Sequence, residues 1–198
     1  MSRSNREELL RAAWSVIAVR GVHGLRVEDV AEAVGVTKSL AYYHFKSRAG
    51  LLAATLDYNE GLAPTTILYT ADGDGLQRLR AAALAEFDDS EPVRMNNIVW
   101  HEINAAATFD EELRERVNAM TRRWIGEVAD AIREGQRDES IRADVEADTA
   151  AELLTALIAG FIERVLVDDS SRDRARNLVS DWITDRLRAP AKPRARVR

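Results

Sequence analysis

The sequence contains no cysteine and only four prolines among its 198 residues. The absence of cysteine excludes disulfide bonds, thiolate catalysis and cysteine-bound zinc. Long apolar runs are also missing: the longest, residues 153–162, is interrupted by Thr155 and Gly160, whereas a helix needs about 20 apolar residues to span a bilayer. The first residues form no apolar signal region. We therefore expect a cytoplasmic protein with no membrane partner.

Short motifs typical of enzymes are absent as well. The three histidines are His23, His44 and His101, and no metalloprotease, serine-hydrolase, P-loop or dinucleotide-binding motif occurs. His101 and Glu102 are adjacent, but neighbouring residues on a helix point about 100° apart and do not form a catalytic pair. We expect no catalytic residues, no metal site and no cofactor.

Acidic residues outnumber basic ones in the whole sequence, but basic residues outnumber acidic ones near the N-terminus. The net charge is −5, yet the first 50 residues carry eight basic and five acidic side chains. An acidic protein is a poor partner for DNA by composition alone. Here the local positive excess lies on a segment that can approach phosphate groups.

Helical spacing of apolar residues dominates the sequence, and no useful length alternates with period two. This pattern predicts an all-α fold. Three helices are expected before residue 48, giving about nine in all. The helices expected after them span 48–62, 76–88, 91–107, 110–135, 147–167 and 172–188.

Residues 27–45 are typical of two short helices joined by a tight turn. Four apolar residues lie at i, i+3, i+4 and i+7 on the first helix: Val27, Val30, Ala31 and Val34. Gly35 then favours the left-handed conformation that ends helices, and Thr37 is a good N-cap for a helix beginning at Lys38. This arrangement predicts a helix-turn-helix, whose second helix can enter the major groove of DNA.

The same segment resembles the TetR family of bacterial transcriptional repressors. The resemblance runs from about Arg6 to Leu52 and is most specific where Tyr42-Tyr43-His44-Phe45 follows the Gly-Val-Thr-Lys turn. It implies a DNA-binding domain at 1–47 and a helical ligand-binding and dimerisation domain at 48–188. Residues 189–198, rich in proline and basic residues, are expected to form a disordered tail.

Residue by residue, the resemblance implies a set of DNA contacts. Phosphate contacts are implied for Thr37, Tyr42, His44 and Arg48, and base contacts for Lys38, Ser39 and Tyr42. The physical reading agrees for Lys38 and Ser39, which occupy the first turn of the second helix, because lysine donates to guanine and a helix N-terminus attracts phosphate. His44 is alternatively a structural histidine. Core packing is the preferred interpretation of Tyr43 and Phe45.

Three further residues complete the expected DNA-binding set. Leu40-Ala41 stands where TetR relatives carry a small hydroxyl residue and then a larger aliphatic, so Leu40 either touches a thymine methyl group or packs inward. Arg26 replaces the usual Ser or Thr N-cap and can meet a phosphate. Lys46 adds positive charge. These departures mean that no relative's operator sequence can be transferred to this protein.

Two C-terminal helices carry apolar residues on more than one face. A helix that is apolar nearly all round must be covered on two sides, and a partner chain can supply the second cover. The expected interface residues are Leu153, Leu157, Gly160, Val179, Trp182 and Ile183. Such a twofold dimer would present two recognition helices to a palindromic operator.

The expected C-terminal domain, 48–188, resembles the choline-regulator, BetI-like branch of the TetR family. This resemblance implies a small-molecule inducer. The residues that carry the resemblance include Trp100, Trp124, Gly135-Gln136, Ile141-Arg142-Ala143-Asp144 and Gly160. The expected ligand-binding residues are Asn97, Trp100, His101, Asn104, Met120, Trp124 and Phe161. Glu102 and Glu127 can attract a cation beside an aromatic ring.

Each of these assignments has a plainer alternative. The aromatic residues are equally consistent with a hydrophobic core, and the polar and acidic ones with solvated surface. The competing function is an architectural DNA-binding protein without an inducer. An enclosed cavity in the C-terminal domain would favour the regulator with an inducer over the architectural protein.

Overall fold

The computed structural model describes residues 3–59, 68 and 71–190. Within these residues it contains nine α-helices with described bounds, two short 3-10 helices and no β-strand, which confirms the all-α prediction. None of the described helices is both long enough and apolar enough to cross a membrane. The chain forms two compact units, one from residues 1–63 and 89–119 and the other from 64–88 and 120–198.

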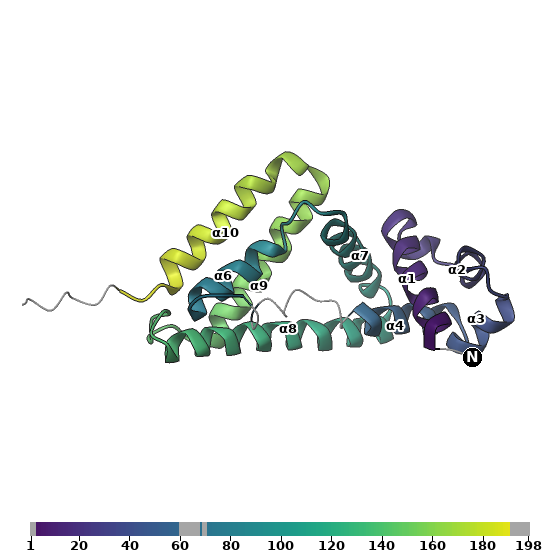
Figure 1. Cartoon of the computed structure of the whole chain (residues 1–198), viewed down its shortest axis with the longest axis horizontal. Helices are drawn as coiled ribbons and strands as arrows, with labels where there is room; N and C mark the ends of the chain where they lie inside the picture. The colour runs from purple at the N-terminus through teal and green to yellow at the C-terminus, as the bar shows by residue number, and fades with distance from the viewer. Residues whose placement is uncertain (1–2, 60–67, 69–70, 191–198) are drawn as a thin grey trace, which may run out of the picture. The chain divides into compact units, whose positions relative to one another are not determined.

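The first unit is built around α1 (Arg3–Arg20), which contacts α2 (Val27–Val34), α4 (Arg48–Asn59) and α7 (Glu91–Ala107). A 3-10 turn, η1 (Val22–Gly24), joins α1 to α2, and α3 (Lys38–Phe45) packs on α2 and α4 (Figure 1). The most deeply buried apolar side chains of this unit include Leu9, Ile17, Leu25, Val30, Leu51, Leu56, Val99 and Ile103.

This unit extends beyond the predicted DNA-binding domain 1–47, because α7 joins it through buried Val99 and Ile103. The predicted bounds 91–107 agree with α7. The predicted helix 48–62 corresponds to α4, and its last residues lie outside the described part of the chain. Most of the predicted tail, residues 191–198, lies outside it too.

The second unit contains α6 (Gly75–Ala85), most of α8 (Glu111–Arg137), α9 (Ala147–Val167), η3 (Asp169–Ser171) and α10 (Arg172–Leu187). In Figure 1, α10 runs beside α6 and α9, and both neighbours contact it. The α9 and α10 bounds agree with the predicted spans 147–167 and 172–188 to within one residue. The core includes Phe87, Ile132, Leu154, Ile158, Val179 and Ile183.

The N-terminal end of α6 is held tightly. Asp74 and Gln77 form a capping box, with both side-chain to backbone hydrogen bonds at 2.9 Å. Asp138, just past α8, accepts from the Gly75 N–H at 2.7 Å. Gly75 also touches Gly135 of α8 so closely that a Cβ atom on Gly75 would lie 2.4 Å from the Gly135 Cα.

The C-terminal end of α6 is held by two arginines of α10. Arg172 donates to the carbonyl oxygens of Phe87 and Asp88 at 3.3 and 3.1 Å, and Arg176 donates to that of Leu84 at 3.0 Å. Cations at a helix C-terminus satisfy free carbonyls and complement the helix dipole. Both ends of α6 are thus fixed within the second unit.

Candidate functional site

The turn between α2 and α3 has the geometry that the sequence predicts. Gly35 adopts φ 72° and ψ 27°, the left-handed conformation that glycine adopts without strain. Thr37 caps α3, because its hydroxyl oxygen accepts a 3.3 Å hydrogen bond from the Leu40 N–H. Arg26 precedes α2 and makes no side-chain capping bond. Its exposed guanidinium therefore remains a predicted phosphate contact.

One face of α3 is buried and the opposite face is exposed. Ala41 and Phe45 are buried, as predicted for Phe45. Tyr43 is 74% exposed, so its predicted core role is wrong. The reason is helical phase: Tyr43 lies two residues from each buried neighbour, about 200° around the helix. Its ring contacts that of His44, 5.5 Å between centroids, and His44 in turn contacts the ring of Phe45.

The outward face of α3 is polar and aromatic. Lys38, Ser39, Tyr42, Tyr43 and Lys46 are exposed, while Leu40 and His44 are half-buried. This surface offers an ammonium group, hydroxyl groups and aromatic rings on a single helix and its C-cap. These are the group types that contact phosphates and base edges.

Tyr42 is oriented by a residue of α2. Its hydroxyl donates to the Glu28 carboxylate at 3.0 Å. The pKa of Glu28 is lowered, first by a hydrogen bond from its own backbone N–H and then by the Tyr42 hydroxyl. The same bond raises the pKa of Tyr42. Glu28 therefore positions the tyrosine that the sequence assigns to DNA contact.

Arg48 makes contacts that differ from its predicted role. Its Nε donates to the Leu25 carbonyl at 2.9 Å, and Nη2 donates to the Val22 carbonyl. The guanidinium thus ties the start of α4 to the segment that leads into α2. This geometry favours a structural role for Arg48 over the predicted phosphate contact.

The predicted ligand residues of α7 do not share one environment. Asn97 is buried, Trp100 is half-buried, and His101 and Asn104 are exposed. Asn104 Nδ2 donates to the Trp100 carbonyl at 2.7 Å. Glu102 of the same helix accepts a hydrogen bond from the Val22 N–H, so its predicted role as an attractor of cations is not supported.

A pocket lies within the second unit, between α6, α8 and α9. Its empty space is about 320 Å³, including its opening to solvent. The lining residues are Leu68, Leu79, Ala82, Ala83, Glu86, Trp124, Val128, Leu154 and Ile158. Trp124 is the predicted ligand residue among them. Met120 and Phe161 are half-buried in the same unit, and the Arg164 guanidinium lies over the Phe161 ring.

Apart from Trp124, the sequence predicts none of the lining residues, and Glu86 is the ionisable one among those described. Burial raises the pKa of its carboxyl to about 7, because a low-dielectric environment disfavours the charged form. The sequence did contain a signal. Leu79, Ala82, Ala83 and Glu86 follow the spacing i, i+3, i+4 and i+7, so a carboxyl ends an apolar helical stripe.

The predicted dimer residues divide into two groups. Leu153 is 56% exposed, Gly160 is exposed, and Leu157 and Trp182 are half-buried. Val179 and Ile183 are 0% exposed because they pack in the core of their own chain. We therefore remove these two residues from the expected interface. Leu178, 39% exposed on α10, lies at the surface instead.

Comparison with known proteins places these features in a family. Residues 75–188 match the family model for the C-terminal domain of BetI-type transcriptional repressors, and residues 9–55 match the model for bacterial regulatory proteins of the tetR family. The chain belongs to the TetR family. It is a DNA-binding transcriptional regulator, with α2 and α3 as its helix-turn-helix.

Several transcriptional regulators are similar to this chain over most of their length. A regulator from Rhodococcus sp. is 35% identical, with a TM-score of 0.84, and aligns over 93% of this chain and 98% of its own. A regulator from Saccharomonospora viridis, solved in complex with choline, is 28% identical, with a TM-score of 0.83, over 96% of this chain and 100% of its own. The regulator BetI from Serratia proteamaculans is 26% identical over 98% of each protein.

The BetI-like segment at 135–144 has a structural explanation in this TetR-family protein. Gln136 Nε2 donates to the carbonyls of Arg142 and Val145 at 3.2 and 2.8 Å. The Arg142 N–H donates to the Leu187 carbonyl at 2.9 Å, so the loop after α8 pairs with the end of α10. This part of the family pattern therefore stabilises the second unit.

Proposed function

We propose that this protein represses transcription in the cytoplasm as a homodimer that binds a palindromic operator and is released by a small organic ligand. The observation that carries the proposal is the outward face of α3, which joins Lys38, Ser39 and Tyr42 to the exposed Tyr43. A recognition helix of this kind reads base edges through its N-terminal residues. Tyr43 joins the proposed DNA contacts, and Arg48 leaves them.

Dimerisation is supported by the exposed surface of α9 and α10. Leu153, Ala156, Leu157 and Gly160 follow a helical spacing and none is fully buried in the chain alone. Exposed apolar stripes mark interaction sites. A twofold pair would place two α3 helices in successive major grooves about 34 Å apart.

A ligand response is supported by the pocket and by α8, which contributes residues to its lining. Trp124 lines the pocket from α8, and Arg116 of the same helix pairs with Asp57 of α4 at 3.5 Å. A ligand that shifts α8 would therefore change the support of α4, which follows α3 in the chain. An allosteric coupling of about 1–3 kcal/mol would lower operator affinity about 5- to 150-fold.

The test is selection of bound sequences from a random duplex pool by the purified protein. We expect a palindrome with half-site centres about 10 base pairs apart. Lys38→Ala should relax preference at one base pair per half-site, at a cost of about 1–3 kcal/mol. Arg174→Ala, a change at an exposed arginine of α10, is the control and should leave the selected sequences unchanged. Recovery of no preferred sequence would favour the architectural alternative.

A further inference from the structure

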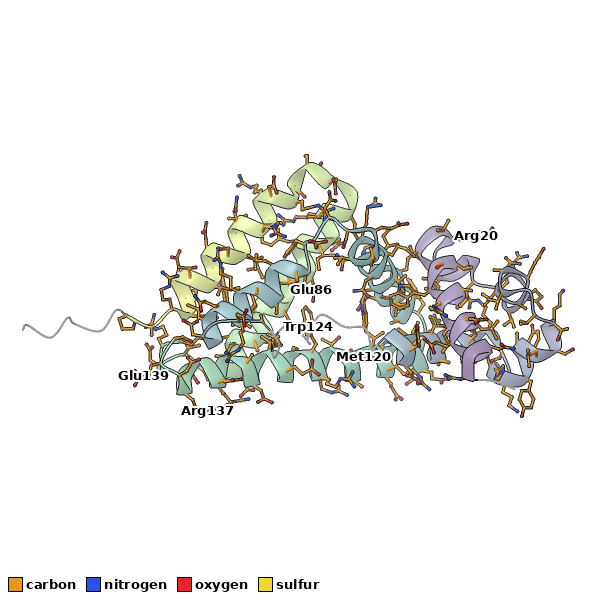
Figure 2. The ribbon with its side chains drawn as sticks, viewed as in Figure 1. Arg20, Glu86, Met120, Trp124, Arg137 and Glu139 are labelled. Atoms are coloured by element: carbon orange, nitrogen blue, oxygen red, sulfur yellow. The ribbon has the colours of Figure 1, made fainter. Side chains whose placement is uncertain are left out.

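The pocket between α6, α8 and α9 combines apolar walls with a single acidic group. Among its described lining residues, Glu86 is the one ionisable side chain. The other residues that α6, α8 and α9 contribute are Leu79, Ala82, Ala83, Trp124, Val128, Leu154 and Ile158. Figure 2 labels Glu86 and Trp124, whose side chains lie in the region that these helices surround.

Two features of this pocket favour a positive charge. The first is the Glu86 carboxyl itself. The second is the Trp124 indole, since tryptophan has the aromatic face that binds cations best. The dipole of α6 adds nothing here, because Arg172 and Arg176 already bind the carbonyl oxygens at its C-terminal end.

The walls specify the rest of the ligand. Leucine, isoleucine, valine and alanine side chains offer no hydrogen-bonding groups, so they favour a compact hydrocarbon body. A carboxylate has about four lone-pair positions. Glu86 can therefore accept from an ammonium N–H whatever other contact it makes, and a charge-assisted bond of this kind is stronger than a neutral one. A quaternary ammonium has no N–H to donate and would lack that bond.

We infer that Glu86 and Trp124 form the binding site for a small apolar amine in its protonated form, with the ammonium N–H donating to Glu86 and the hydrocarbon body against the apolar walls. The inference rests on the proposed ligand-responsive function and names its ligand class. It also gives Glu86 a role as a ligand-binding residue.

The inference is tested by calorimetric titration of the full-length protein without DNA. The probes share a cyclohexyl body and differ in the polar group: cyclohexylammonium, cyclohexanol, cyclohexanecarboxylate and cyclohexyltrimethylammonium. We expect cyclohexylammonium to bind most tightly, by on the order of tenfold over cyclohexanol. The carboxylate probe should bind most weakly. Equal binding of ammonium and alcohol, or no saturable binding of the ammonium, would overturn the inference.

Substitutions assign the effect to Glu86. Glu86→Gln should reduce cyclohexylammonium affinity by on the order of tenfold and leave cyclohexanol affinity nearly unchanged, which also shows that the pocket remains folded. Glu163→Gln, at an exposed acid of α9, is the matched control and should behave as wild type. Trp124→Phe should weaken the ammonium more than the alcohol. Full ammonium affinity in Glu86→Gln would contradict the inference.

The pH dependence gives an independent readout. Because the pKa of Glu86 is about 7 before the ligand binds, the ammonium must displace a proton below that pH, and its affinity should fall about tenfold per pH unit there. Glu86→Gln should show no such slope. Operator titration then separates the two proposals: ammonium binding without loss of operator affinity would refute the inducer function and leave the amine site standing.

Discussion

The carboxylate of Glu102 on α7 accepts a 3.0 Å hydrogen bond from the backbone N–H of Val22. This bond satisfies a donor at the start of η1, directly after α1. Gly21 makes the approach possible, because it adopts φ 71° and a Cβ atom there would lie 2.6 Å from Glu102 Oε2. The Glu102 carboxylate thus adds a hydrogen bond to the apolar contacts by which α7 packs on α1 and η1.

We predict that Glu102→Ala lowers the unfolding free energy by about 1–3 kcal/mol, because a partly buried N–H loses its acceptor. Glu102→Gln keeps an acceptor oxygen and should cost less. Gly21→Ala should destabilise the protein through both backbone strain and the clash. Urea denaturation of the single and double variants measures the coupling: if the two costs simply add, the close contact has no energetic consequence.

Arg48 and Lys46 should differ in how they affect DNA binding. Arg48→Ala removes hydrogen bonds to two backbone carbonyls and should lower the stability of the first unit, with little change in the salt dependence of operator binding. Lys46→Ala, at an exposed residue, should leave stability intact and reduce the salt slope by about 1. Thermal melting and binding at several salt concentrations check both. A reduced slope in Arg48→Ala would restore its phosphate contact.

Gly160 provides a test of the dimer that does not disturb the single chain. A Cβ atom at Gly160 or at Gly126 would meet nothing within 4 Å in the single chain. Both glycines lie in helices, and leucine is favoured over glycine in a helix by about 0.5–1 kcal/mol. Gly160→Leu should weaken the dimer, whereas Gly126→Leu should not. Sedimentation equilibrium measures both. An unchanged dimer in Gly160→Leu would place the interface elsewhere.

Glu86 should make stability depend on pH. Its pKa rises from 4.5 to about 7 on folding, so the folded state binds a proton more tightly than the unfolded state. This contribution is fully present below pH 4.5, declines as pH rises, and is lost above about pH 7, a difference of about 3 kcal/mol. Glu86→Gln should remove it. The measurement is the unfolding free energy of both proteins at pH 5 and pH 8. An equal change with pH in wild type and Glu86→Gln would show that the pKa of Glu86 does not differ between the folded and unfolded states.

Local features of the fold followed from the sequence, while contacts between distant residues did not. The Gly35 turn and the Thr37 cap depend on neighbouring residues, so spacing was enough to predict them. The face of α3 that Tyr43 occupies depends on which side packs against α2 and α4. Likewise, nothing near Arg48 in sequence indicates that its guanidinium reaches the carbonyl of Val22.

The surface of α10 and the pocket between α6, α8 and α9 likewise depend on contacts between residues that are distant in sequence. Helical periodicity identifies two apolar faces on α10 but does not say which one the chain covers itself, so Val179 and Ile183 were assigned to the wrong face. Glu86 was not predicted because glutamate is rarely buried, so a glutamate at the end of an apolar stripe is normally expected to face solvent. Its burial depends on the packing of α8 and α9 against α6, which the sequence does not reveal.

The fixed ends of α6 determine how the pocket can respond to an occupant. Contacts to Gly75 at one end and to the carbonyls around Glu86 at the other leave this helix little freedom to shift. A molecule bound at the proposed site would therefore meet one stationary wall, which carries the carboxyl group, and would displace the opposite walls in proportion to its bulk. On this proposal charge determines whether an amine binds and size determines how far α8 and α9 move, so we expect two amines of equal affinity to differ in their effect on DNA binding.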